Sequence, residues 1–429
     1  MDVSRVPAHP PFARAIIHIG TERTGSTTIQ RALSRNRDVL LHHGALYPRS
    51  LGRSSHGALA TICQSIEPRD EFARNAVRRY GGTLEEARAA VAERFAAEVV
   101  AHLDSGAPPS VLVISSEHLH SRLVTLEEKQ RLADFLAPWV RDVEIYAYLR
   151  PQADLAKSVY NFRIKNGGTG GDEVFPALDS RQRRYYDYTS MLDEYARIFG
   201  DASVHPVLFE PRSFPERDVV RDLLERSGLP REGFEFRDST NESLSAPALE
   251  FMRRFNAEVP RRIDDKSQVV RRTVDRFVAQ YEGPAFAVDG HEAADFQRQF
   301  DEDNETLRSR WFPERETLFP PVRTDTVPVE VSESELLDLS IALYVASQDD
   351  IRAERVRALI IESRLRAVQG RRRTALRRAT DALAWAGSDS ELVEEAESRL
   401  AELASAPRRG SVRWLVGGVR RRLRTLVRR

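Results

Sequence analysis

The chain has 429 residues, with 65 Lys and Arg balanced by 65 Asp and Glu, so its formal net charge is zero. This balance gives no overall positive field, and nucleic acid is therefore not an expected partner. A single cysteine, Cys63, excludes an intrachain disulfide and suits a reducing compartment. With 41% hydrophobic residues, the chain can bury a substantial core.

No targeting or membrane-spanning segment is predicted. Residues 1–11 lack the apolar core of a signal peptide. We also find no run of about 18 apolar residues, the length that a membrane-spanning helix needs. These observations predict a cytoplasmic protein.

Apolar runs alternate with helical patterns over the first 320 residues. Four runs have the character of buried strands: 15–19, 110–115, 143–149 and 203–209. Three segments between them have helical spacing or composition: 26–41, 85–102 and 126–139. Pro151 suits the first turn of another helix. The alternation predicts an α/β fold, a P-loop-like parallel sheet flanked by helices.

The proline-rich sequence Phe319-Pro320-Pro321 predicts the end of this first domain. Residues 333–405 are almost wholly helix-forming. We therefore expect an α/β domain over 1–320, a linker over 321–332, a small all-helical region over 333–405 and a basic tail over 406–429.

The segment Gly20–Thr27 has the spacing of a phosphate-binding loop, G-x-x-x-x-G-x-[ST], between a predicted strand and a predicted helix. Such a loop presents backbone N–H groups and a helix N-terminus to an anion. A nucleotide kinase would carry lysine where Ser26 stands, and here the cation comes earlier, at Arg23. Thr24, Gly25, Ser26, Thr27 and Thr28 complete the donor-binding set expected in this loop.

A second anion-binding pair follows the strand predicted at 143–149. Arg150 stands at the strand end and Ser158 lies eight residues later, about two turns into the next helix. From these positions a guanidinium and a hydroxyl can converge on one phosphate.

In this order the two motifs resemble those of sulfotransferases that use 3′-phosphoadenosine 5′-phosphosulfate, and the Leu-Arg-Pro-Gln sequence at 149–152 looks like bacterial carbohydrate-type members. The resemblance covers roughly residues 13–320. It implies that the 20–28 loop binds the 5′-phosphosulfate and that Arg150 and Ser158 bind the 3′-phosphate. It implies no metal. In the family a lysine contacts the bridging oxygen, and this chain has Arg23 at that position.

The reaction that the resemblance implies is transfer of a sulfuryl group to an acceptor hydroxyl, in a carbohydrate or glycan precursor. A base that takes the acceptor proton would be histidine or glutamate, as in relatives. His56, in a polar loop, is the first candidate, and an ordinary exposed loop histidine is the alternative. Glu117 and His118 follow a predicted strand and are further candidates, because ligands bind at this edge of open α/β sheets.

Two other function classes stay open. An apolar strand ending in the acidic Glu117 is also typical of magnesium-dependent P-loop kinases and nucleoside triphosphatases. The Arg23 departure is also compatible with a non-catalytic nucleotide-binding interaction protein. No zinc-ligand spacing occurs in the sequence.

Two basic segments are candidates for partner binding. The first combines arginines with tyrosines: Arg181, Arg183, Arg184, Tyr185 and Tyr186. It is either a surface for an acidic or sugar acceptor or a solvated helix start. The second, residues 408–429, has nine arginines, no acid and apolar residues at helical spacing. It predicts contact with an anionic membrane surface, with a disordered tail as the alternative.

Overall fold

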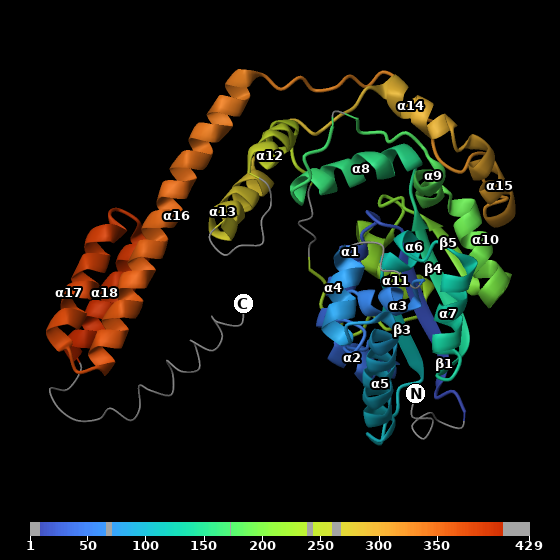
Figure 1. Ribbon diagram of the computed structural model, residues 1–429, viewed down its shortest axis with the longest axis horizontal. Helices are drawn as coiled ribbons and strands as arrows, with labels where there is room; N and C mark the ends of the chain where they lie inside the picture. The colour runs from blue at the N-terminus through green and yellow to red at the C-terminus, as the bar shows by residue number, and fades with distance from the viewer. Residues whose placement is uncertain (1–8, 66–70, 172, 238–242, 260–266, 406–429) are drawn as a thin grey trace. The chain divides into compact units, whose positions relative to one another are not determined.

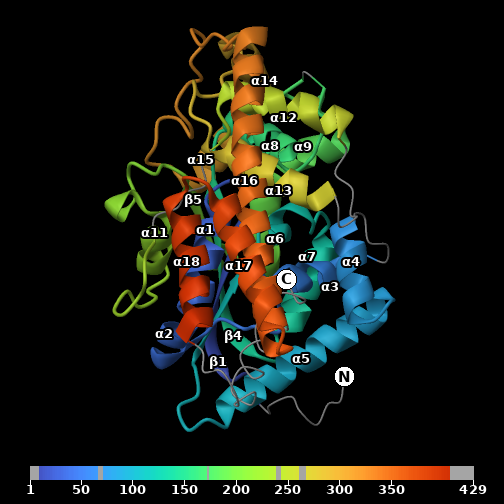
Figure 2. The same cartoon turned by 90° about the vertical axis from the view of Figure 1, so that its left-hand side faces the viewer.

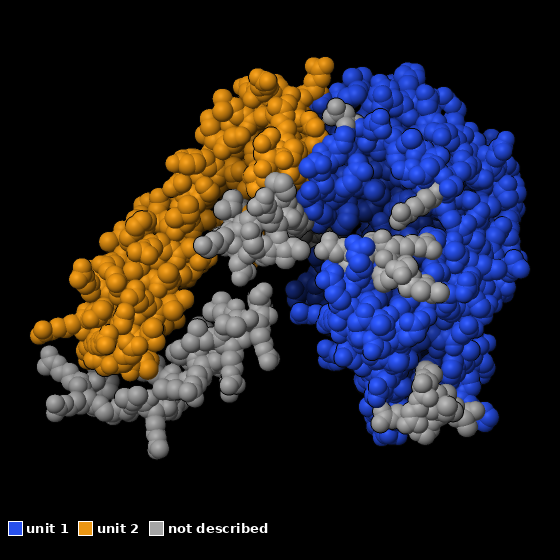
Figure 3. All heavy atoms as spheres, in the orientation of Figure 1, with its two compact units in different colours: residues 1–243, 285–329 blue, residues 244–284, 330–429 orange. Residues whose placement is uncertain are grey.

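The computed structural model describes residues 9–65, 71–171, 173–237, 243–259 and 267–405 (Figure 1). The chain forms two compact units (Figure 3). Unit 1 contains residues 1–243 and 285–329, and unit 2 contains residues 244–284 and 330–429. The predicted basic tail lies outside the described residues.

Unit 1 is built on a five-stranded sheet in which every pairing is parallel. The strand order is β2-β3-β1-β4-β5. The strands are β1 Phe12–Gly20, β2 Ala45–Leu46, β3 Val111–Ser115, β4 Val140–Leu149 and β5 Val204–Leu208. The predicted α/β class with a parallel sheet is confirmed, and the two-residue strand β2 is an addition that the sequence pattern did not indicate.

Strand β1 is buried on both faces, which explains its continuous apolar sequence. Ile17 and Ile19 pack on one face with residues of α5, α7, α8 and α10. Ile16 packs on the other face with residues of α1, α2 and α11. Helices therefore cover both faces of the sheet, and the side chains of β1 lie in the two cores that they form.

The helices of unit 1 begin where the local sequence can cap them. Thr83 and Thr125 form capping boxes with Glu86 and Glu128 at the starts of α5 and α7. The helices of unit 1, with two 3-10 turns, are α1 Ser26–Arg35, α2 Arg37–His42, α3 Gly57–Cys63, α4 Glu71–Tyr80, α5 Leu84–Leu103, α6 His118–Ser121, α7 Leu126–Leu136, α8 Gln152–Lys165, α9 Ser180–Tyr186, α10 Tyr188–Phe199, η2 Asp201–Ser203, η3 Pro215–Arg217, α11 Val219–Arg226, α14 Gly290–Arg298 and α15 Asp301–Trp311.

The helix predicted over 26–41 is divided into two at Asn36. The Asn36 amide nitrogen donates to the carbonyl oxygens of Ala32, at 2.9 Å, and Glu235, at 3.0 Å. Its amide oxygen accepts from the backbone N–H of Glu235 at 2.7 Å. Asparagine competes for backbone groups in this way, and here it joins the helix break to a distant loop.

Unit 2 is helical, which confirms the predicted character of its C-terminal part. It contains α12 Ala246–Glu258, α13 Ser267–Gln280, α16 Glu333–Val368, α17 Arg372–Ala386 and α18 Ser390–Ser405. Helices α16, α17 and α18 lie side by side (Figure 2). Helices α12 and α13 also contact α16, so residues 244–284 group with this unit, although the sequence-based boundary counted them in the first domain. Among the described residues, no helix is both long and apolar enough to cross a membrane.

Three histidines of unit 1 are buried in neutral form. Burial lowers the pKa of His18 and of His56 from 6.5 to about 3, and that of His120 to about 4. In the unfolded chain each ring would titrate near its usual pKa of about 6.5. Between these values the unfolded state binds more protons than the folded state, so stability is lost as the pH falls.

We therefore expect acidification from pH 7 to pH 5 to remove about 2 kcal/mol of unfolding free energy for each of these histidines. His18→Gln should reduce the difference between the two pH values by about that amount. Denaturant unfolding at pH 7 and pH 5 measures it, with the exposed His291→Gln as the control. If the loss of unfolding free energy between pH 7 and pH 5 is the same in His18→Gln as in the wild type, His18 is not buried in neutral form.

Candidate functional site

The carboxyl ends of three adjacent strands meet at one cavity of about 850 Å³. The loop after β1 contributes Arg23, Glu117 follows β3, and Arg150 follows β4. Strand β1 has β3 on one side and β4 on the other, so the strand order reverses here. Ligands of open α/β sheets bind at such a position. The two predicted anion motifs therefore belong to a single site, which we call the loop cavity.

Buried hydroxyls give the 20–28 loop its shape. Thr24 Oγ1 and Ser26 Oγ donate to the carbonyl oxygen of Thr21 at 2.7 and 3.0 Å. Thr21 Oγ1 in turn donates to the carbonyl oxygen of Tyr148, on β4, at 2.9 Å. These bonds fix the loop against the neighbouring strand, while Thr27 and Thr28 are more exposed and line the cavity.

Gly25 begins helix α1 in the left-handed region, at φ 83°, and no side chain caps the helix. The first N–H groups of α1 have no partner within the helix. The start of the helix, which is the positive end of its dipole, lies at the cavity. A Cβ atom on Gly25 would lie 2.8 Å from Val219 Cγ1. Glycine is therefore required here both by the backbone conformation and by the close approach of α11.

Arg23 joins the two motifs directly. Its Nε donates to Ser158 Oγ at 3.0 Å, and its guanidinium lies 4.9 Å from the ring centre of Phe162. Arg150 Nη1 donates to the carbonyl oxygen of Arg23 at 2.9 Å. Arg23 thus forms one cluster with Arg150 and Ser158, which lie 127 and 135 positions away in sequence.

The cluster holds positive charge in a half-buried position. Burial lowers the pKa of Arg23 and of Arg150, and the nearby Arg150 charge lowers that of Arg23 further. Arg150 Nε is buried and has no hydrogen-bond partner. Three more arginines line the loop cavity: Arg122, Arg217 and Arg237. An anion placed here would relieve the repulsion and supply the missing acceptor.

Glu117 lies against the loop from the other side. A Cβ on Gly20 would lie 3.2 Å from both the Cα and the Cβ of Glu117, so a larger residue would push the loop away from Glu117 by a few tenths of an ångström. The Glu117 carboxylate accepts a hydrogen bond from the Gln30 side chain. Glu117 and His118 both line the loop cavity.

His56 is not among the residues that line the loop cavity, contrary to the position expected for the first candidate base. It is fully buried, and its Nε2 lies 2.9 Å from the carbonyl oxygen of Pro48. Its Nδ1 accepts from the backbone N–H of Ser115 at 3.2 Å. With both ring nitrogens bonded to backbone and the pKa lowered by burial, His56 ties the 48–56 loop to β3. A loop histidine and a buried one give the same local sequence signal.

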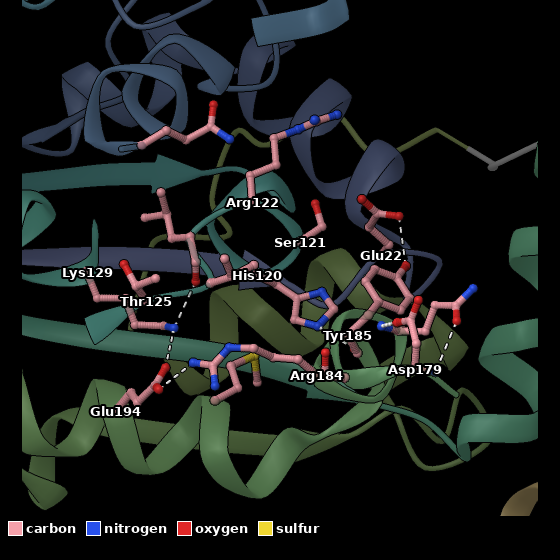
Figure 4. Close-up of a pocket in the computed structure, with 16 residues that line it drawn as sticks. Glu22, His120, Ser121, Arg122, Thr125, Lys129, Asp179, Arg184, Tyr185 and Glu194 are labelled. Atoms are coloured by element: carbon pink, nitrogen blue, oxygen red, sulfur yellow. Dashed lines mark hydrogen bonds and ion pairs between the residues drawn. The ribbon is translucent and has the colours of Figure 1, made fainter. Parts of the chain in front are cut away.

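A second cavity, of about 1090 Å³, adjoins the first (Figure 4). Glu22 and Arg122 line both cavities. Of the basic aromatic segment, Arg184 and Tyr185 line the second cavity, whereas Arg183 pairs with Asp303. Sequence reasoning did not single out Glu22, although it lies inside the phosphate-loop motif. Its Oε2 accepts from the Tyr185 hydroxyl at 2.8 Å, a contact across 163 positions that no local pattern indicates.

Comparison with known proteins gives one distant relative and no family. No family model matches the chain, and no solved structure matches it. An uncharacterized protein of Archaeoglobus fulgidus is 28% identical over 204 residues, which is 47% of this chain. The match spans about half, 54%, of that relative's length.

The Gly25 contact predicts a measurable stability cost. Gly25→Ala should lower the unfolding free energy by about 1–2 kcal/mol for the left-handed conformation and by about 1–3 kcal/mol for the clash with Val219. In a Val219→Ala background only the conformational part should remain. Chemical denaturation of both single variants and the double variant measures this. If the two single losses of unfolding free energy add up to the loss in the double variant, the contact with Val219 contributes nothing to the cost of Gly25→Ala.

Proposed function

We propose that this chain is a sulfotransferase that moves a sulfuryl group from 3′-phosphoadenosine 5′-phosphosulfate to an acceptor hydroxyl. The observation that supports this most is the Arg23–Ser158 hydrogen bond, because it joins a phosphate loop to a second anion pair in one cavity. The donor has a 5′-phosphosulfate and a 3′-phosphate, one for each motif. In this proposal the sheet is P-loop-like and the enzyme is cytoplasmic.

The described residues fit such a donor. The uncapped N-terminus of α1 suits the 5′-phosphate, since it offers several N–H groups to one anion. Arg150, with its buried and unpartnered Nε, suits the 3′-phosphate, and Ser158 lines the same cavity. When bound, the donor supplies an activated sulfuryl group.

The residues of the chain then have distinct tasks. Arg23 and the start of α1 stabilise the negative charge that develops on the leaving phosphate. A guanidinium serves this purpose as a fixed charge with a planar set of donors, while lysine would act as a point charge. A base must accept the proton of the acceptor hydroxyl, and the loop cavity offers Glu22, Glu117 and His118 near the loop.

Nucleotide binding tests the donor assignment. Arg150→Ala should weaken binding of adenosine 3′,5′-bisphosphate by about 10- to 100-fold, because a charged hydrogen bond to phosphate contributes about 1.5–3 kcal/mol. Binding of adenosine 5′-monophosphate should change little. Ser158→Ala should weaken the bisphosphate in the same direction. Titration calorimetry measures all of these affinities.

The matched control is Arg141→Ala, since Arg141 is 71% exposed and does not line the cavity. It should bind both nucleotides like the wild type. Equal wild-type affinity for the two nucleotides would overturn the assignment. Magnesium-dependent turnover of adenosine triphosphate would instead favour a P-loop kinase or nucleoside triphosphatase, and tight bisphosphate binding without transfer to any hydroxyl would favour a non-catalytic nucleotide-binding protein.

A further inference from the structure

The second cavity borders the proposed donor site at two residues that line both cavities, Glu22 and Arg122. Glu22 projects from the phosphate loop itself, and Arg122 follows helix α6. The rest of the second cavity comes from Gln64 at the end of α3, the 120–125 segment, α7, α9 with its cap Asp179, and α10 (Figure 4). A molecule bound here could therefore present one group to the loop cavity past Glu22.

The charges that line the second cavity are balanced and already paired. Lys129 is 2% exposed, and its Nζ donates to Glu194 Oε2 at 2.6 Å and to the carbonyl oxygen of Leu123 at 2.8 Å. Arg184 donates to the other oxygen of Glu194. The Glu22 carboxylate opposes the lowering of the Arg122 pKa by burial.

The remaining acid is also engaged. The Asp179 carboxylate accepts from the backbone N–H of Gln182 at 2.7 Å, as the cap of α9. The lining thus contains three cations and three carboxylates, each with a partner in this chain. An anionic or cationic ligand would have to compete with these pairs, whereas a neutral ligand would not.

Two buried acceptor atoms of residues that line this cavity, His120 Nδ1 and Gln64 Oε1, have no hydrogen-bond partner. His120 is 6% exposed, and its Nε2 lies 3.1 Å from the carbonyl oxygen of Tyr185. A carbonyl oxygen only accepts, so Nε2 carries the hydrogen of the neutral ring and Nδ1 is left as an acceptor. His120 Nδ1 is buried with no hydrogen-bond partner. A ligand hydroxyl would satisfy it, and a carboxylate would not.

Apolar surface accompanies these polar groups. The ring of Tyr185 lies 5.1 Å from that of His120, and Leu123, Val124 and Met191 also line the cavity. Rings beside paired polar groups suit a ligand that has both C–H faces and hydroxyls. A volume of about 1090 Å³ is ample for a sugar of one or two rings.

We propose that the second cavity is the acceptor pocket and that it binds a neutral, polyhydroxylated ligand such as an uncharged sugar ring, which places one hydroxyl beside Glu22. This inference rests on the proposed function. Glu22 is then the catalytic base: its carboxylate takes the hydroxyl proton while the acceptor oxygen forms a bond to sulfur. The bond from sulfur to the bridging oxygen breaks, and its electron pair leaves on the phosphate beside Arg23. Tyr185, which donates to Glu22 at 2.8 Å, is a positioning residue.

Ligand charge tests the pocket. The full chain, saturated with adenosine 3′,5′-bisphosphate, is mixed with methyl β-glucoside, methyl β-glucuronide or the protonated methyl glycoside of glucosamine. Saturation-transfer NMR should give the neutral ring a signal at least about threefold stronger than either charged ring. Ser180→Trp, at an exposed position that lines the cavity, should abolish this signal. Ser105→Trp, exposed and lining neither cavity, should keep it.

The inference is overturned if a charged ring gives an equal or stronger signal, if none of the three rings gives a signal, or if Ser180→Trp leaves the signal intact. Bisphosphate binding is measured in the same samples and separates the two proposals. Loss of nucleotide binding in the wild type defeats the proposed function. Intact nucleotide binding without the expected sugar signal defeats the acceptor pocket alone, and it also shows that the variants are folded.

Turnover tests the role of Glu22, with the bound ring as acceptor and labelled donor. Glu22→Gln should keep both ligands bound but lower the transfer rate by about 100-fold or more, since general bases contribute about 10²–10⁴-fold. Glu117→Gln, whose carboxylate is bonded to Gln30, should lower it by less than about tenfold. The reverse order of the two losses would assign the proton to Glu117 and overturn the role of Glu22.

Discussion

The hydrogen bond from the Arg150 side chain to the backbone of Arg23 is the constraint on which this site depends. Arg23 and Arg150 are joined by the backbone of one and the side chain of the other, at the ends of two neighbouring strands. Two like charges in a half-buried place repel each other, and burial disfavours each of them. Strands β1 and β4 pair as far as Gly20 and Ala147, which brings the loop after β1 close to the end of β4. The Arg23 guanidinium is held there by its hydrogen bond to Ser158 and its contact with the Phe162 ring.

This arrangement of positive charge favours the binding of an anion in the cavity. The helix start, the orphaned Arg150 Nε and the excess of arginines act in the same direction. Carboxylates that line the cavity partly offset the positive potential of its arginines. Two of them, Glu22 and Glu117, can also accept a proton. In the proposed function, residues of this one cavity would serve both donor binding and proton removal.

The sheet and its loop could be predicted from sequence because their signals are local. Buried parallel strands are continuous apolar runs, and the loop has a fixed glycine spacing between such a run and a helix. Arg150 and Ser158 were predictable because a strand end and a helix periodicity place them. Burial of His56 was not, since its partners are the backbone of Pro48 and Ser115 and are known only from the fold. The break at Asn36 and the grouping of residues 244–284 with α16 depend in the same way on contacts between distant segments.

Glu22 and Arg122 have one further consequence, which concerns the two cavities together. A wall shared by two pockets cannot adjust to one occupant without changing the surface that the other meets. Occupancy of the two pockets is then thermodynamically linked, and the linkage is reciprocal: whatever one ligand does to the affinity of the other, the other does in equal measure to the first. The Glu22–Tyr185 bond lies on that wall, so it is one contact through which a ligand in one pocket would change the affinity of the other.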